Sequence, residues 1–455
     1  MDDKMRAISI PVLHCPALIR DFGDYFKDLF TTSEYRIFIS FLCGYIFGIV
    51  GCSNIFRFLM FSPSVSSLDN FLNSDLYIKL NRRHKRRLLS ILKKIKLDPE
   101  RYLYAVDDTF LEHYGKNIWG TYWWNDHGKK AIFGHKLLVV GLVDRKHKVL
   151  IPLIWNVLHR EDNNGNEKQH EKSWEVALRL LQELDKNGYE KFPIVADSAF
   201  CCEEFFSLLS KMDYKICAEF KCNRIAVKHI FRRFHMRLDV FFRTRSRKTI
   251  YYNKKPKLAS EAILWLKDAK ERPYKVSAIA NKTSRDKEPF AYYGTNQLAW
   301  DATKIWGLSR DRWAIEVQFR DLKQFFTLGE AAVRSKEAVE TTISLSAIAL
   351  TVIRLQQIEK AESQKIGNRY VRPIPAGDIV RKLQLSSMFE SISSLATNND
   401  QREKVLIRFN DANFCQKPAD FRKEKLEPER GIVSFLKSLV ESAAEKFWGH
   451  QMAYR

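Results

Sequence analysis

Two aspartates end apolar stretches of the chain and could share one cation. Asp107 lies at the end of YLYAVDD (Tyr102 to Asp108), and Asp197 follows the apolar part of FPIVADSAF (Phe192 to Phe200). Functional groups of open α/β sheets gather where strands end, so carboxylates on neighbouring strands would lie close together. Hard oxygen ligands without His or Cys favour Mg²⁺ or Mn²⁺ over zinc. Taken alone, each Asp is more simply explained as the cap of a following helix or turn.

A third carboxylate lies on a predicted helix, SRDRWAIEVQFRDLKQFF (Ser309 to Phe326). At about 100° per residue, four polar residues fall within roughly 60° of one another: Ser309, Arg312, Glu316 and Lys323. An adjoining apolar stripe would anchor the helix on the sheet: Ile315, Phe319, Leu322 and Phe326. An Arg–Glu pair on an exposed face is the simpler interpretation, but the stripe favours a lined cleft.

These segments resemble the insertion-sequence DDE transposases that carry a Tyr-Arg-Glu-Lys signature. The resemblance rests on VDDTFL (106–111), IVADSAF (194–200) and RWAIEVQFRDLKQFF (312–326), and runs from about Arg101 to Lys365. In that signature Tyr is followed after two residues by Arg, after three more by Glu and after six more by Lys. Arg312, Glu316 and Lys323 match this spacing, whereas Ser309 stands at the Tyr position.

The resemblance implies that Asp107, Asp197 and Glu316 form a catalytic triad holding two Mg²⁺ ions, or Mn²⁺ in their place. Asp108 is a rival for the first position. Asp107 is preferred because the family usually has Asp, one residue, then Ser or Thr, as in Asp107-Asp108-Thr109. Arg312 and Lys323 would hold phosphates of the transposon end, and Ser309 would take the place of the Tyr that positions that end.

The implied reaction is in-line phosphoryl transfer on double-stranded DNA. Water attacks at the transposon end and frees a 3′-hydroxyl, which then attacks target DNA. A homodimer is implied as well, because pairing two ends needs two active sites. Two alternatives remain open: an RNase H-like nuclease that cuts without joining would share all three carboxylates, and a catalytically inert, transposase-derived DNA-binding protein would be expected to have lost one of them.

The order of elements predicts an α/β fold. A first strand (102–108) precedes a hairpin of strands His135–Asp144 and Lys148–Leu158, a helix from a Ser173 cap to Gly188, and strands at 192–200 and 214–220. We therefore expect an RNase H-like mixed sheet with flanking helices over residues 99–365. A mainly β insertion is predicted at about 222–300, before the last catalytic helix. In relatives an aromatic side chain of this insertion can accept a flipped base; Trp300 is a candidate, although a core position explains it better.

Residues 1–98 predict a helical DNA-binding domain, and residues 366–455 a helical C-terminal region. The segment Leu80 to Lys96 reads as a basic amphipathic helix whose cations could contact duplex phosphates: Arg82, Arg83, Lys85 and Arg86. A solvated helix face is an equal alternative. The net charge of +22, from 76 Lys and Arg against 54 Asp and Glu, favours a polyanionic partner.

The uncharged segment Ile37 to Phe56 is long enough to span a membrane. Its glycines and the Ser53-Asn54 pair instead predict a buried helix ending near Gly51 and a second helix after it, with no comparable apolar stretch elsewhere. A membrane-associated protein is the minority alternative. Eight scattered cysteines lack zinc-site spacing and follow no secretory signal, which favours reduced thiols in a cytoplasmic, bacterial-type protein that joins the nucleoid when bound to DNA. His127, His135 and His159 are expected on surfaces or loops.

Overall fold

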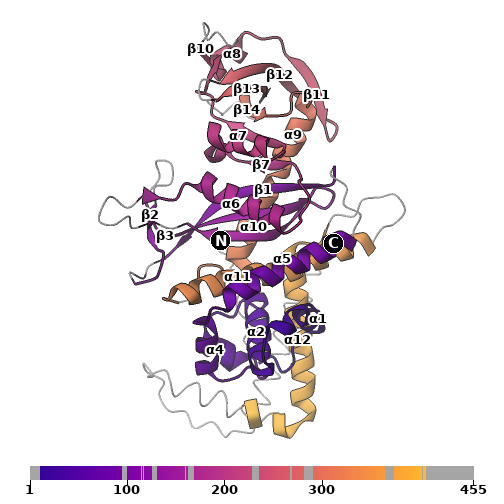
Figure 1. Ribbon diagram of the computed structural model, residues 1–455. Coiled ribbons are helices and arrows are strands. Elements are labelled where there is room, and N and C mark those ends of the chain that lie inside the picture. Colours follow the sequence, from indigo (N-terminus) through magenta and orange to yellow (C-terminus); the bar gives the residue numbers. More distant parts are fainter. Residues whose placement is uncertain are drawn as a thin grey trace, which may run out of the picture.

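The computed structural model describes residues 11–405, apart from 95–99, 114, 116, 125–130, 159, 162–168, 228–234, 267–268, 281–289, 331–332, 364–372 and 402. His127, His159 and Cys415 therefore lie outside the described residues. The fold is mixed α/β and extends along one axis in three tiers (Figure 1): N-terminal helices, a central mixed sheet, and a β-rich tier. The seven described cysteines are all free thiols.

The N-terminal tier consists of short helices around an apolar core. They are α1 (Ala17–Gly23), the 3-10 helix η1 (Asp24–Leu29), α2 (Thr32–Ile46), α3 (Cys52–Phe58), α4 (Val65–Leu72) and α5 (Leu76–Lys94). The predicted break is confirmed, although α2 ends earlier than expected. Gly48 and Gly51 have φ angles of 72° and 82°, which favour glycine and stop the helix. Residues 37–46 are all buried, so this apolar segment is a core helix rather than an exposed span.

The central tier is built on strands β1 (Tyr102–Glu112), β2 (Tyr122–Trp124), β3 (Ile132–Asp144), β4 (Val149–Val157), β7 (Ile194–Ala196) and β8 (Ile216–Phe220). Five of them lie in the order β4-β3-β1-β7-β8, with β3 antiparallel to β1 and β4, and with β7 and β8 parallel to β1. The predicted hairpin is thus confirmed as β3 and β4. Strands β5 (Arg160–Glu161) and β6 (Gln169–His170) form a separate two-stranded sheet.

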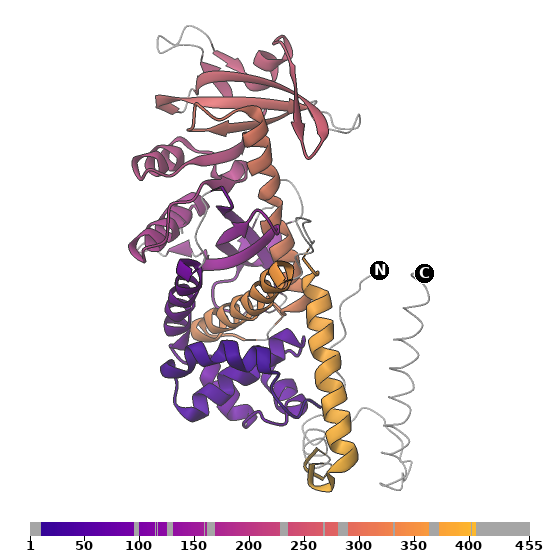
Figure 2. The same cartoon turned by 90° about the vertical axis from the view of Figure 1, so that its right-hand side faces the viewer.

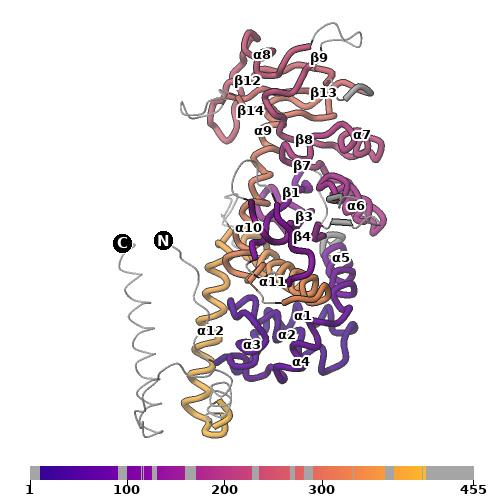
Figure 3. Tube along the Cα trace, turned by 90° about the vertical axis from the view of Figure 1, so that its left-hand side faces the viewer, coloured from indigo at the N-terminus to yellow at the C-terminus, as the bar shows by residue number. Residues whose placement is uncertain are grey.

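Helices cover both faces of this sheet. Figure 3 shows α6 (Ser173–Lys186) and α7 (Glu203–Lys211) on one side, and α9 (Ala302–Asp311) and α10 (Trp313–Phe325) on the other. Alternate residues of β1 supply the two cores, as expected for a strand buried on both faces. Leu103 and Ala105 join the core beneath α10, whereas Tyr104 and Val106 join the core beneath α6 and α7.

The segment predicted as mainly β contains β9 (Ile225–Val227), β10 (His235–Arg237), the short helix α8 (Leu238–Arg243), β11 (Lys248–Tyr252), β12 (Lys255–Leu266), β13 (Ala269–Ala280) and β14 (Phe290–Thr295). It is continuous with the central sheet, because β14 pairs with β8 in an antiparallel ladder. Together the two tiers make one twelve-stranded sheet. Trp300, just after it, is 9% exposed and belongs to the core beneath α9.

The helix predicted at Ser309–Phe326 is divided between α9 and α10, which meet at Arg312 (φ −54°, ψ −33°). Its apolar stripe is buried as predicted: Ile315, Phe319, Leu322 and Phe326. The chain continues through α11 (Lys336–Ser363) and α12 (Ala376–Thr397), and α12 runs down beside the N-terminal helices (Figure 2). Gln384 of α12 donates a hydrogen bond to the Phe47 carbonyl, which fastens this helix to the first tier.

Helix α11 corrects the expectation that no second long apolar stretch exists. Within the described part of the chain it is the one helix long and apolar enough to cross a membrane. Of its most apolar stretch, 94% is buried inside the protein. It packs against β4, α2 and α5 as a core helix. Thr342, Ser344 and Thr351 donate their hydroxyl hydrogens to carbonyls one turn earlier, so these polar groups are satisfied in the core.

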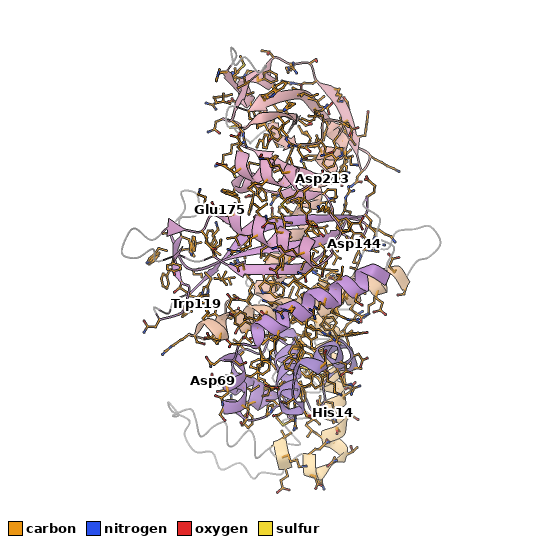
Figure 4. The ribbon with its side chains drawn as sticks, in the orientation of Figure 1. His14, Asp69, Trp119, Asp144, Glu175 and Asp213 are labelled. Carbon is orange, nitrogen blue, oxygen red and sulfur yellow. The ribbon has the colours of Figure 1, made fainter. Side chains whose placement is uncertain are left out.

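Two buried aspartates clamp α9 and α10. Asp311, 1% exposed, accepts a 2.6 Å hydrogen bond from Arg145 Nε in the β3–β4 turn. Asp321, 4% exposed, accepts a 2.8 Å hydrogen bond from Arg354 Nη2 of α11. The helical ridge that carries Arg312 is therefore held at both ends. Asp144, the last residue of β3 before this turn, and Trp119 are labelled on opposite sides of the central tier in Figure 4.

We predict that Arg354→Met lowers the free energy of unfolding by about 3 kcal/mol, because it removes the buried partner of the Asp321 carboxylate. Urea unfolding of the two proteins measures this difference. Arg320→Met is the matched control, since Arg320 also approaches Asp321 at 3.4 Å but its side chain is 59% exposed. That change should cost no more than about 1 kcal/mol; equal losses in the two variants would contradict the clamp.

Candidate active site

The register of three parallel strands places three carboxylates in one row. Val106 of β1 pairs with Ala196 of β7, and Ala196 pairs with Ala218 of β8. The next residue along each chain segment is acidic: Asp107, Asp197 and Glu219. Neighbouring strands lie about 4.8 Å apart, so the backbones of these acids are direct neighbours. We call this set the carboxylate row.

The placement of Asp107 differs from the sequence-based prediction. Asp197 does follow the end of its strand, but Asp107 lies inside β1, which continues to Glu112. Pairing between β1 and β7 stops at Val106, while pairing between β1 and β3 continues to Glu112. The antiparallel partner therefore prolongs the strand beyond the acid. Asp197 also accepts a 2.8 Å hydrogen bond from Ala199 N, so it caps the short 3-10 helix η2 (Ser198–Phe200) as well.

Helix α10 brings Arg312 and Glu316 onto the carboxylate row. Arg312 Nη1 donates to Asp107 Oδ2 at 3.0 Å, and Arg312 Nη2 donates to Glu316 Oε1 at 2.7 Å. Lys323, further along the helix, donates to Thr109 Oγ1 at 2.8 Å. Asp107 and Thr109, on one face of β1, thus contact Arg312 at the start of α10 and Lys323 within it.

The electrostatics of this cluster are dominated by burial and mutual repulsion. Burial, followed by the negative charge of Asp197, raises the pKa of Asp107 to about 8, although the positive charge of Arg312 opposes this rise. Burial alone would lower the pKa of Arg312, but the surrounding carboxylates outweigh it and raise the pKa: Asp107, Glu316, Asp197 and Glu219. One guanidinium therefore compensates several acids at once.

Asp108, the rival for the first position, faces the other side of β1. It forms an ion pair of 2.9 Å with Lys136 and accepts a 2.9 Å hydrogen bond from Ser173 Oγ. Ser173 was predicted to cap α6, but Lys172 holds that position and makes no side-chain cap. The Ser173 hydroxyl serves Asp108 instead. Asp108 is therefore engaged by Lys136 and Ser173, whereas Asp107 contacts Arg312.

A cleft of about 940 Å³ opens beside the carboxylate row. Asp107, Asp197 and Lys323 line it, together with Lys136, Lys172 and Trp174 from the α6 side. In the described residues no three His, Cys, Asp or Glu side chains are arranged to hold one metal ion. The Arg312 guanidinium donates hydrogen bonds to both Asp107 and Glu316 at this place.

Other predicted residues are placed differently. The Ser309 hydroxyl donates back to the Trp306 carbonyl at 2.8 Å, one turn before Arg312. On α5, Arg82 and Arg86 are exposed. Arg83 instead pairs with Asp28 at 3.1 Å. Lys85 is 6% exposed and pairs with Glu183, so its ammonium is turned into the protein and away from any external phosphate.

His135, expected at the surface, is a correction as well. It is 1% exposed in β3, and both of its ring nitrogens form hydrogen bonds. Nδ1 pairs with His113 Nε2 at 2.9 Å, and Nε2 pairs with the Trp119 carbonyl at 2.6 Å. His135 is buried because it lies inside β3, a strand that is buried on both faces. The residue type alone gives no sign of this position.

Two residues of the site were missed by the sequence analysis. Glu219 completes the carboxylate row, and Tyr293 of β14 lies directly opposite it. Burial raises the pKa of Tyr293, while a hydrogen bond with Ser309 opposes the rise, which places its hydroxyl beside α9. A signal for Glu219 existed, since YKICAEF is an apolar stretch with an acid at its end, like those of Asp107 and Asp197. The pairing that brings in Tyr293 has no local signal.

The chain was compared with known proteins. Residues 59–277 match the family model of the DDE superfamily endonuclease, a stretch that includes Asp107 and Asp197 and ends before Glu316. This match supports an endonuclease or transposase of the DDE type. No curated protein matches the chain. A solved piggyBac transposase synaptic complex with hairpin DNA is similar at 10% identity, over 90% of this chain and 84% of that one, with a TM-score of 0.41. A score this low supports no further conclusion.

We predict that the metal-free protein loses stability as pH rises from about 4 to about 8. Asp107 keeps its proton in the folded state up to a pKa of about 8, whereas the unfolded chain releases it near 3.8. Each pH unit in this window then lowers the free energy of unfolding by up to about 1.4 kcal/mol. Urea unfolding across this range, in a chelating buffer, should show a shallower decline for Asp107→Asn. An unchanged slope in that variant would show that Asp107 titrates normally.

Proposed function

We propose that this protein is a DNA transposase that cuts at transposon ends and joins them to target DNA. The observation that carries the proposal is the contact of Arg312 with both Asp107 and Glu316, beside Asp197 and at the edge of a large cleft. Two acids from adjacent strands and one from a helix, with a matching Arg and Lys, are the constellation that the transposase resemblance requires. The endonuclease family match supports the same class of enzyme.

The donor set fits divalent cations. Asp107 is largely buried next to Asp197, and a buried carboxylate pair of this kind is stabilised by a positive charge. Asp107, Asp197 and Glu316 offer only hard oxygen atoms, as Mg²⁺ and Mn²⁺ prefer. Two such ions, when bound, supply activation of the attacking oxygen and stabilisation of the leaving oxygen. Arg312 must release its two carboxylates before both can serve as ligands.

The topology supports an RNase H-like core. An antiparallel hairpin, β3 and β4, follows the first strand; helices α6 and α7 then alternate with β7 and β8, both parallel to the first strand. The final acid comes from a helix after the β-rich segment. This is the layout expected from the resemblance, with residues 99–365 as the catalytic domain.

Several cations are placed to meet the phosphates of DNA. Lys172 and Lys323 line the cleft, and Arg82 and Arg86 are exposed on α5. A net charge of +22 adds a long-range attraction for a polyanion. Joining two ends in one event would require two copies of the chain, so a homodimer on DNA is part of the proposal.

The decisive variant is Glu316→Gln, tested on DNA carrying the sequences that flank the gene. We expect the parent to cleave these ends and join them to target DNA in Mg²⁺. The variant should bind the DNA normally and lose at least about 100-fold in both steps, because it lacks one charge of the triad. Asp108→Asn is the comparison for the rival first position. Asp108 lines the same cleft, but Lys136 and Ser173 engage its carboxylate, so this variant should retain cleavage.

Each other outcome has a distinct meaning. Cleavage by the parent without joining would replace the transposase with a nuclease of the same fold. DNA binding without any chemistry in the parent would replace it with an inert DNA-binding protein. Full activity in Glu316→Gln would remove Glu316 from the triad.

A second prediction concerns α5. Replacing both Arg82 and Arg86 by Gln should weaken DNA binding on all sequences and reduce the slope of log affinity against log salt by about 2, about 1 for each phosphate contact. Fluorescence anisotropy at several salt concentrations measures the slope. Lys146→Gln is the control, because Lys146 is half-exposed in the β3–β4 turn and pairs with Glu362. An unchanged slope in the α5 variant would assign this helix to the solvated surface.

A further inference from the structure

Glu219 occupies the third place of the carboxylate row without a bonded partner. Its neighbour across the sheet is Asp197, through the Ala196–Ala218 pair. Among the described residues no hydrogen bond or ion pair engages its carboxylate; the contact from Cys201 Sγ, at 2.9 Å, goes to its backbone carbonyl. Burial raises the pKa of Glu219 and Arg312 opposes the rise, so the guanidinium of Arg312 lies within electrostatic reach.

The far side of Glu219 is closed by β14. Tyr293 pairs directly with Glu219, and its neighbour Gly294 lets the Phe220 ring lie against the strand, where a Cβ atom would come within 2.0 Å of that ring. This close approach fixes β14 on β8. Glu219 is therefore held at one register position, between Asp197 and the half-buried Tyr293.

Arg312 faces a conflict that Glu219 can resolve. In the structure its two terminal nitrogens are committed to Asp107 and Glu316. These are two of the three acids that the proposed function assigns to metal ligation, so the guanidinium competes with a cation for them. A displaced guanidinium in a partly buried site needs another carboxylate, because an uncompensated buried charge is costly.

We propose that Glu219 is a positioning residue that receives the Arg312 guanidinium when Asp107 and Glu316 are released to a divalent cation. This inference rests on the proposed function. Arg312 stays inside the site after the exchange, with Glu219 as its partner. Glu219 touches neither cation nor DNA in this scheme; it acts only through Arg312.

The experiment measures Mn²⁺ binding to the full-length, metal-free protein without DNA, from the electron paramagnetic resonance signal of free Mn²⁺. Glu219→Gln should weaken binding about fivefold, the scale of a coupling between neighbouring groups. Arg312→Gln should strengthen binding, because it removes the competing cation. The informative protein is the double variant: with Arg312 already replaced, Glu219→Gln should have little further effect.

A set of controls keeps the result specific. Arg312→Lys retains a competing cation, so the effect of Glu219→Gln should persist in that background, which guards against misfolding of Arg312→Gln. Glu219→Asp should restore part of the lost affinity. Glu204→Gln, an exposed acid on α7, should leave Mn²⁺ binding unchanged.

The outcomes separate the inference from the function on which it rests. If Glu219→Gln weakens binding equally with and without Arg312, Glu219 acts as a ligand or by its own field, and the positioning role is wrong. If Glu219→Gln binds Mn²⁺ like the parent, the inference alone fails. If the parent binds no Mn²⁺, the metal-dependent function fails together with it.

Discussion

The crowding of acidic side chains around one guanidinium is the main physical constraint at the candidate site. Asp107, Asp197 and Glu219 are forced together by strand register, and one guanidinium, that of Arg312, balances them with Glu316. Repulsion among acids is costly in a partly buried site, so the arrangement can persist only where the surrounding fold supplies more stability than the site removes. The packing of the surrounding elements provides this stability.

This stability comes chiefly from the elements that hold α9 and α10 in place. Asp311 fastens the helical joint to the β3–β4 turn, and Asp321 fastens the far end of α10 to the buried helix α11. Helix α11 in turn packs on β4 and on the N-terminal helices. The first tier and the central sheet therefore share one core, and the position of Glu316 depends on packing that begins at α2.

Much of this could be predicted from local patterns. The apolar runs before Asp107 and Asp197 and the stripe of Ile315, Phe319 and Leu322 fixed the elements and the face of each, because these patterns follow the periods of strand and helix. What local patterns could not show was pairing at a distance. The extension of β1 past Asp107 depends on β3, the burial of Lys85 depends on Glu183, and the place of Tyr293 depends on the β8–β14 ladder. Glu219 was within reach of prediction, since it follows the same pattern as the two aspartates.

The ladder between β14 and β8 has a mechanical consequence. The β-rich tier is joined to the central sheet by the backbone hydrogen bonds between β14 and β8, so the two tiers form one continuous, stiff sheet. A rotation of that tier would break the hydrogen bonds between β14 and β8, the strand that carries Glu219. Any molecule lying across both tiers therefore meets a fixed template, and the bending needed for a close fit has to occur in that molecule.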